Sequence, residues 1–221
     1  VCEGDNRRIT RREADGSYTP IAERVDGKKI NRPNDVVGRS DGSIYFTDPG
    51  GRLPAEEREL DYSGVHRIAL DGSVTNATSD TEYPNGLAFS PDESILYVAI
   101  TRLNDGCIQE KERGEVCRHQ FIRAFDVADD GSLSNNRVFA DMFSAEDGVP
   151  DGMKVDAEGR VFCTGSGGIW VISPQGVQIG VIRVSEVPRN LAFGGPDLST
   201  MYITAGDSVY SLESEARGIP T

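Results

Sequence analysis

The stretch Pro84-Asn85-Gly86-Leu87-Ala88-Phe89, followed after a turn by Ile95-Leu96-Tyr97-Val98, sets the pattern on which the chain is built. It consists of a proline, a polar residue, a short apolar run, a turn and a second apolar run. Two such runs joined by a turn predict a β-hairpin. The pattern also begins at Pro33, Pro150 and Pro188, so each repeat places a different polar residue at one equivalent position: Asn34, Asn85, Asp151 or Arg189.

A second set of turns falls between these hairpins, at 15–17, 71–73, 130–132 and 174–176. Each turn follows another short apolar run, which predicts an outer hairpin beside each inner one. An inner and an outer hairpin together form an antiparallel sheet of four strands. Repeats of this kind are typical of β-propeller blades, and a β-sandwich is the alternative.

The number of blades predicted in this way does not close a ring. Residues 1–27 indicate only an outer hairpin, and the last repeat provides three strands that end near Tyr210. The chain therefore contains about four and a half blades. Either an N-terminal stretch is missing or another chain completes the ring. We expect an all-β chain that forms a single domain over residues 1–221.

Composition narrows the range of partners. The 221 residues are 37% hydrophobic, which is enough for a real core, and the formal net charge is −13. This charge argues against nucleic acid, which attracts basic surfaces, and favours a cation. No apolar run has membrane-spanning length, and the N-terminus does not resemble a signal peptide. We expect a soluble cytoplasmic protein with no membrane partner.

The four cysteines show no CxxC spacing and no neighbouring histidine cluster, which argues against a zinc–thiolate site. Cys163 falls inside an apolar run and is expected in the core. Cys107 and Cys117 bracket a charged loop. They would form a local disulfide in an oxidising compartment and stay reduced in the cytosol.

Blade geometry predicts where the functional residues lie. Inner strands that run in the same direction bring all four proline starts to one mouth of a central channel. The long charged segments 50–63 and 101–119 follow second strands, so they should lie at that mouth as well. Long loops in compact domains often carry function, although a plain solvated surface loop is the alternative.

Four ordered motifs resemble a known family: NRPND at 31–35, YFTDP at 45–49, YPNGLAFSPD at 83–92 and VPDGMKVD at 149–156. The chain is similar to the gluconolactonase family, which also contains senescence marker protein and luciferin-regenerating enzyme. The resemblance implies a six-bladed propeller with one catalytic divalent cation and activity on lactones. It also implies that this chain lacks the N-terminal blade and a half, together with the glutamate ligand of the first blade.

The resemblance implies roles for four residues. Asn85 and Asp151 would bind the metal. Arg32 and Asn34 would lie beside it and hold substrate, and Asn34 is also counted among the metal ligands. Asp48 ends a second strand at the mouth, so it would either contact substrate or cap the Thr47–Pro49 turn. One carboxylate and two amides form an all-oxygen set that suits calcium first, with magnesium or manganese as alternatives and zinc tolerated. Asp151 would also accept the proton of the attacking water.

Two other hydrolase mechanisms are disfavoured. Neither of the two histidines lies beside a motif, and Gly165-Ser166-Gly167-Gly168 is not a GxSxG elbow. The leading hypothesis is a metal-dependent lactonase acting on a small sugar lactone. A non-catalytic, metal-stabilised binding scaffold and an inactive fragment remain open, and the sequence does not indicate the oligomeric state.

Overall fold

The computed structural model describes residues 1–51, 53–102, 104, 107, 113–115 and 119–220. Within these residues the chain is almost entirely β, with strands β1–β20 and one short 3-10 helix, Ala55–Glu57. The all-β prediction is therefore confirmed. The chain divides into two compact units, residues 1–85 with 102–117 and residues 86–101 with 118–221. That all 221 residues form one domain stays a prediction.

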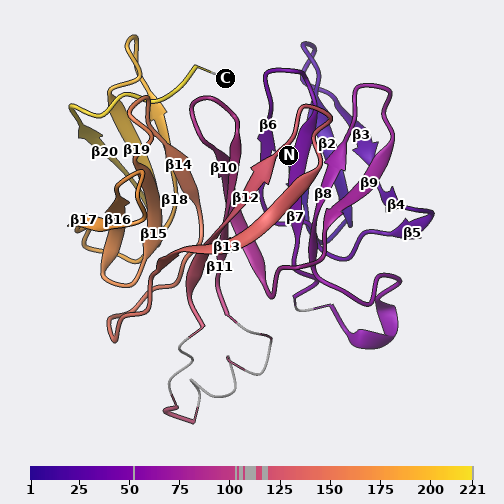
Figure 1. The fold of residues 1–221 in the computed structure, drawn as a ribbon, viewed down its shortest axis with the longest axis horizontal. Coiled ribbons are helices and arrows are strands. Elements are labelled where there is room, and N and C mark those ends of the chain that lie inside the picture. The colour runs from indigo at the N-terminus through magenta and orange to yellow at the C-terminus, as the bar shows by residue number, and fades with distance from the viewer. Residues whose placement is uncertain (52, 103, 105–106, 108–112, 116–118, 221) are drawn as a thin grey trace. The chain divides into compact units, whose positions relative to one another are not determined.

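The first unit contains two antiparallel sheets and a small hairpin (Figure 1). The sheets and hairpin are β1 (Cys2–Glu3), β2 (Arg8–Arg12) and β3 (Tyr18–Ala22); β4 (Arg24–Val25) with β5 (Lys28–Lys29); and β6 (Val36–Gly38), β7 (Ile44–Asp48), β8 (Gly64–Ile68) and β9 (Val74–Thr78). Their core packs Ile9 and Ala22 of the first sheet against Phe46 and Ile68 of the other. Alternating inward and outward side chains on short strands produce this packing.

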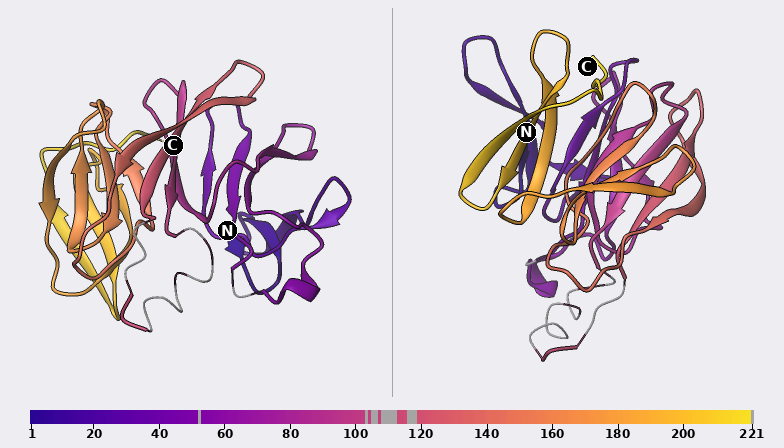
Figure 2. Two further views of the ribbon diagram at one scale, coloured as in Figure 1. Left: turned by 60° about the horizontal axis from the view of Figure 1, so that its bottom comes forward. Right: turned by 90° about the vertical axis from the view of Figure 1, so that its left-hand side faces the viewer.

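The second unit contains three antiparallel sheets in simple meander order. They are β10 (Pro84–Phe89), β11 (Ile95–Ile100), β12 (Phe121–Val127) and β13 (Leu133–Asp141); β14 (Met153–Val155), β15 (Val161–Gly165), β16 (Gly168–Ile172) and β17 (Gln178–Ile182); and β18 (Pro188–Gly194), β19 (Thr200–Ala205) and β20 (Ser208–Glu213). Only the first two residues of β10 belong to the other unit. Phe162 and Ile169 pack against Leu191 and Met201, so the last two sheets lie side by side (Figure 2).

Five blade-like sheets are present among the described residues, rather than the expected four and a half. The prediction for residues 1–27 was too low by one strand, because β1 pairs with β2 through Cys2 with Ile9 and Glu3 with Arg8. A two-residue strand carries no periodic signal that a sequence pattern can detect. The final sheet has the three strands that were predicted.

The Asp-Gly-Ser turns form outer hairpins as expected. Each aspartate carboxylate accepts a hydrogen bond from the serine amide two residues later, for example Ser73 N to Asp71 Oδ1 at 2.9 Å and Ser132 N to Asp130 Oδ1 at 2.9 Å. Gly72 and Gly131 have φ angles of 82° and 83°, which glycine adopts without steric cost. The hydrogen bonds from Ser73 lower the pKa of Asp71.

Three further predictions concern loops, cysteines and membranes. Most of segment 101–119, interpreted as a rim loop, lies outside the described residues. Cys107 is disulfide-bonded, whereas Cys2 and Cys163 are free, and Cys117 lies outside the described residues. None of the helical segments in the described part of the chain has the length and apolar character needed to span a bilayer.

Candidate functional site

Thr47 forms hydrogen bonds with the segments that lead into two inner strands in the first unit. Its hydroxyl donates to the Asn85 carbonyl oxygen at 2.7 Å and accepts from the Asp35 amide at 3.0 Å. The Asn34 amide donates to the Thr47 carbonyl oxygen at 2.9 Å. Thr47 is fully buried, which makes these bonds strong relative to solvent-exposed ones. Asn85 thus lies at the start of β10, as predicted, whereas Asn34 lies two residues before the start of β6.

Asp48 also lies at this end, but its side chain faces the protein interior. It is 1% exposed. One carboxylate oxygen accepts from the Asn31 amide at 2.7 Å, and the other accepts from the Arg32 amide at 2.5 Å. Asp48 therefore holds the backbone that leads to Pro33. These contacts anchor residues 31 and 32 and are not the predicted cap of the Thr47–Pro49 turn, and direct contact with substrate stays a prediction.

Arg32 and Asn34 present their side chains differently. Asn34 is exposed. The Arg32 guanidinium is partly exposed and donates to Asp5 Oδ1 through Nη2 at 2.7 Å and Nε at 3.2 Å. Asp5 is itself 90% exposed, so this ion pair is solvated and weak. A ligand that offers a better acceptor can therefore displace Asp5 from Arg32.

Asp151 lies in the second unit, at the end where three inner strands begin. The Gly86 amide donates to the Asp151 carbonyl oxygen at 3.1 Å, and the Gly152 amide donates to the Arg189 carbonyl oxygen at 2.9 Å. The Thr101 hydroxyl donates to the Pro150 carbonyl oxygen at 2.7 Å. These bonds run from one sheet to the next through the backbone. The half-buried Asp151 side chain is not needed for the bonds that its backbone makes.

Two glycines explain how closely the strand starts approach one another. A Cβ atom on Gly86 would collide with the Asp151 carbonyl oxygen and lie 2.9 Å from the Gly152 Cα. A Cβ atom on Gly152 would lie 2.7 Å from the Asn190 Cα. Glycine is therefore required at these two positions. The sequence shows these glycines, but not the contact that requires them.

Cys163 is fully buried on β15, as expected for a core residue. Burial raises the pKa of its thiol, and the charge of Asp151 adds to this effect. Burial also raises the pKa of Cys2 to about 12. Both thiols are therefore protonated near neutral pH, and neither provides a nucleophile for the site.

We expect iodoacetamide at pH 8 to leave Cys163 unmodified in the native protein, because the thiolate is the reactive form. Mass spectrometry of peptides from protein treated before and after unfolding in denaturant measures this directly. Unfolding should expose the thiol and restore its ordinary reactivity. Alkylation of Cys163 in the native protein at the rate of a free thiol would contradict the prediction.

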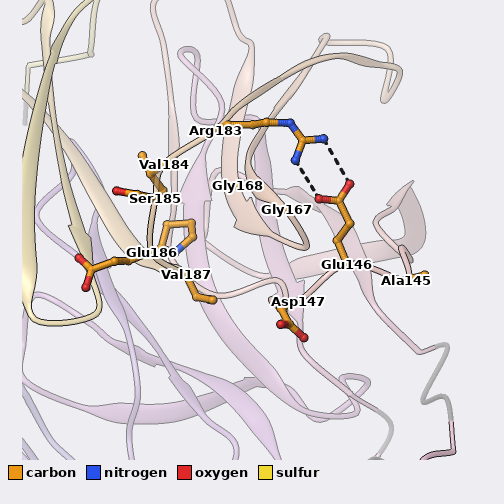
Figure 3. A pocket seen from close by; sticks show the side chains of 11 residues that line it. Ala145, Glu146, Asp147, Gly167, Gly168, Arg183, Val184, Ser185, Glu186 and Val187 are labelled. Atoms are coloured by element: carbon orange, nitrogen blue, oxygen red, sulfur yellow. Dashed lines mark hydrogen bonds and ion pairs between the residues drawn. The ribbon is translucent and has the colours of Figure 1, made fainter.

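A cavity of about 460 Å³ lies in the second unit, lined by segments 145–147, 167–168 and 183–188. In Figure 3 the Arg183 guanidinium faces the Glu146 carboxylate, with hydrogen bonds of 2.8 and 3.2 Å. These bonds lower the pKa of Glu146. The pair neutralises charge at the cavity wall, and we assign no ligand to it. Sequence analysis missed this feature because its two residues are far apart in the chain.

The predicted site residues are thus divided between the units. Arg32, Asn34, Asp48 and Asn85 belong to the first unit, and Asp151 belongs to the second. In the described part of the chain, no cluster of three or more His, Cys, Asp or Glu side chains could hold a metal ion. The predicted ligand set contains a single carboxylate, so this finding does not test it.

Residues 1–207 match the family described as the SMP-30/gluconolactonase/LRE-like region. The chain belongs to this family. Its relatives include a gluconolactonase from Zymomonas mobilis, 30% identical over 210 residues that cover 90% of this chain and 54% of the relative. The family assignment confirms the resemblance seen in the four motifs.

Solved structures of the family share the fold. A candidate gluconolactonase has a TM-score of 0.81 at 30% identity, with 100% of this chain and 71% of that chain covered. A gluconolactonase from Xanthomonas campestris has a TM-score of 0.79 at 34% identity, with 96% and 67% covered. The five sheets are therefore blades of a β-propeller arrangement. The chain spans about half the length of the Zymomonas relative.

Proposed function

We propose that the protein hydrolyses the ester ring of a sugar lactone. The observation that carries this proposal is the repeated strand start of a lactonase-family fold, which fixes the backbone and varies the polar side chain. Asn85 and Asp151 each place their carbonyl oxygen in a bond to a neighbouring strand. The backbone at both positions is therefore fixed by bonds that do not use the side chains. The relatives named above support a lactone as the substrate.

We also propose a divalent cation, held by Asn34, Asn85 and Asp151. The donor set fits, because one carboxylate and two amide oxygens are hard ligands of the kind that calcium, magnesium and manganese prefer. Asn85 is 7% exposed, so its amide is pre-arranged by the surrounding protein. When bound, such an ion would polarise the lactone carbonyl and lower the pKa of a water. Calcium is our first choice.

The chain's own residues provide the remaining steps. The Asp151 carboxylate accepts a proton from the attacking water as its oxygen bonds to the carbonyl carbon. The Arg32 guanidinium stabilises the negative charge that develops on the carbonyl oxygen. The ring C–O bond then breaks, and the leaving oxygen takes back a proton to give a hydroxy acid. Asn34, which both donates and accepts hydrogen bonds, orients the substrate hydroxyl groups.

A panel of sugar lactones, including gluconolactone, tests this function through acid release in a pH-indicator assay. We expect turnover above the spontaneous rate, loss of turnover after treatment with EDTA, and recovery on adding one divalent ion. Calcium, magnesium, manganese and zinc should be added back separately, because oxygen ligands suit several of these ions. This series also identifies the metal.

The same experiment separates the lactonase from its alternative. A protein that binds calcium in a calorimeter but hydrolyses none of the lactones would be a metal-stabilised binding scaffold. Turnover that persists unchanged after complete removal of metal would contradict the role of the cation. It would leave the lactonase proposal intact.

We further propose that the whole protein has six blades. The last sheet supports this, because Tyr202 on β19 and Val209 on β20 lie on the same face and are 44% and 71% exposed. Apolar side chains on one sheet are ordinarily covered by a neighbour. A further blade would cover them and could bring the glutamate that the family resemblance implies. The solved relatives are longer than this chain, which agrees with the proposal.

The compartment also belongs among the proposals. A disulfide at Cys107 favours an oxidising compartment, since cytosolic thiols are kept reduced. This argues against the cytoplasmic location expected from the sequence. The small-molecule substrate remains the proposed partner.

A further inference from the structure

Asp48 at the end of β7 and His66 in the middle of β8 form a buried polar pair. Both side chains are 0% exposed, and His66 Nε2 lies 3.6 Å from Asp48 Oδ2. The two strands are adjacent, with Phe46 paired to His66 and Asp48 paired to Gly64. The pair is therefore built into the sheet and is not a chance contact of mobile side chains.

The Asp48 carboxylate holds a particular piece of backbone. It accepts hydrogen bonds from two successive amides, those of Asn31 and Arg32. Charge-assisted hydrogen bonds to a buried carboxylate are roughly twice as strong as neutral ones. The next residues are Pro33 and Asn34, so the anchored segment is the one that presents the proposed substrate-binding side chains.

Two aromatic rings lie close to the His66 side chain. Its ring lies 5.2 Å from the ring of Phe46 and 6.1 Å from that of Tyr62, measured between centroids. Among the described residues, neither ring nitrogen has a hydrogen-bond partner. A buried nitrogen without a partner is costly, and the Asp48 carboxylate is an acceptor within reach of a small rotation. The Nε2–H tautomer therefore suits this position.

We propose that Asp48 and His66 are positioning residues for the substrate-binding segment. His66 keeps the Asp48 carboxylate in the orientation that accepts both amides, and Asp48 fixes the backbone direction from which Arg32 and Asn34 project. The effect on substrate rests on the proposed lactonase function. The effect on the backbone does not. Asp48 and His66 therefore support the substrate-binding residues from the protein interior and do not themselves touch substrate.

The test uses three variants of the full chain. Asp48→Asn keeps the side-chain shape but replaces one acceptor with an amide donor. His66→Phe fills the same space without a polar atom, and His66→Gln restores a donor near the position of Nε2. Asp61→Asn is the matched control, because Asp61 is an exposed carboxylate in the same unit. Each variant is measured by amide hydrogen exchange at Asn31 and Arg32, which needs no substrate, and by lactone kinetics.

We expect exchange at the Asn31 and Arg32 amides to accelerate about tenfold in Asp48→Asn and His66→Phe. KM should rise by a similar factor while kcat changes much less, because the affected side chains hold substrate. His66→Gln should restore both values, and Asp61→Asn should leave both unchanged. A merely space-filling role for His66 would instead leave His66→Phe unchanged and His66→Gln impaired.

Unchanged exchange in both Asp48→Asn and His66→Phe would overturn the proposal. Faster exchange with an unchanged KM would also overturn it, because the backbone would then not control substrate binding. If the unaltered protein hydrolyses no lactone while exchange accelerates as expected, the lactonase proposal fails and the anchoring by Asp48 and His66 is supported.

Discussion

Replacing Asp151 with alanine is expected to lower kcat/KM for lactone hydrolysis by about a thousandfold or more, since several kcal/mol of charge stabilisation and proton acceptance would be lost. The proposed function gives this carboxylate two tasks, holding the cation and taking the proton of water. The fold should survive the substitution. Asp151 contacts the Gly86 amide through its backbone carbonyl oxygen, which alanine keeps.

Two companion variants sharpen the Asp151 experiment. Asp151→Asn keeps an oxygen ligand but is a poor proton acceptor, so it should bind the cation more strongly than Asp151→Ala while remaining slow. Asp129→Ala removes an exposed carboxylate from the β12–β13 turn and should behave like the unaltered protein. Thermal unfolding of each variant verifies folding. Activity of Asp151→Ala within tenfold of the unaltered protein would remove Asp151 from the mechanism.

The strands could be predicted from the sequence because their signals are local. A proline start, a short apolar run and an Asp-Gly-Ser turn each lie within a few residues, and the structure places hairpins at these positions. Strand β1 lay beyond this method, because Cys2 and Glu3 form too short a run to show any period. The boundaries were less exact, because β6 and β14 begin at Val36 and Met153, three residues after the prolines predicted to start them.

The site was predicted less completely, because its supporting contacts join residues far apart in the chain. The motif at 45–49 drew attention to Asp48, but no pattern shows that its carboxylate faces the interior toward Asn31 and Arg32. His66 lies beside none of the sequence motifs, so nothing in the sequence drew attention to it. Its burial beside Asp48 follows from the register of β7 and β8, which depends on pairing between strands.

The second large effect is expected from Gly86→Ala, which should reduce the free energy of unfolding by about 2–4 kcal/mol. The added methyl group would collide with the Asp151 carbonyl oxygen and crowd the Met153 amide nitrogen at 3.0 Å. These are backbone atoms, which cannot rotate away as a flexible side chain can. Relief requires the start of β10 to move from β14, and this movement weakens the bond from Gly86 to Asp151.

Gly180→Ala is the matched control for this variant. Gly180 lies within β17, no atom lies within 4 Å of its would-be Cβ, and neither it nor Gly86 has a left-handed backbone. The control should therefore change stability by less than about 0.5 kcal/mol. Urea unfolding monitored by the fluorescence of Trp170 compares the two variants. In thermal unfolding, Gly86→Ala should melt roughly 5–15 °C lower than the unaltered protein.

Activity separates this steric explanation from a general loss of stability. Displacement of Asp151 from the Gly86 amide should lower kcat/KM even at temperatures where Gly86→Ala is fully folded, because the proposed ligand and base would move with its backbone. Equal stability of Gly86→Ala and Gly180→Ala would contradict the close approach between β10 and β14. At Asn85 and Asp151, the glycine that follows the varying residue lets neighbouring strands approach closely enough to fix the backbone.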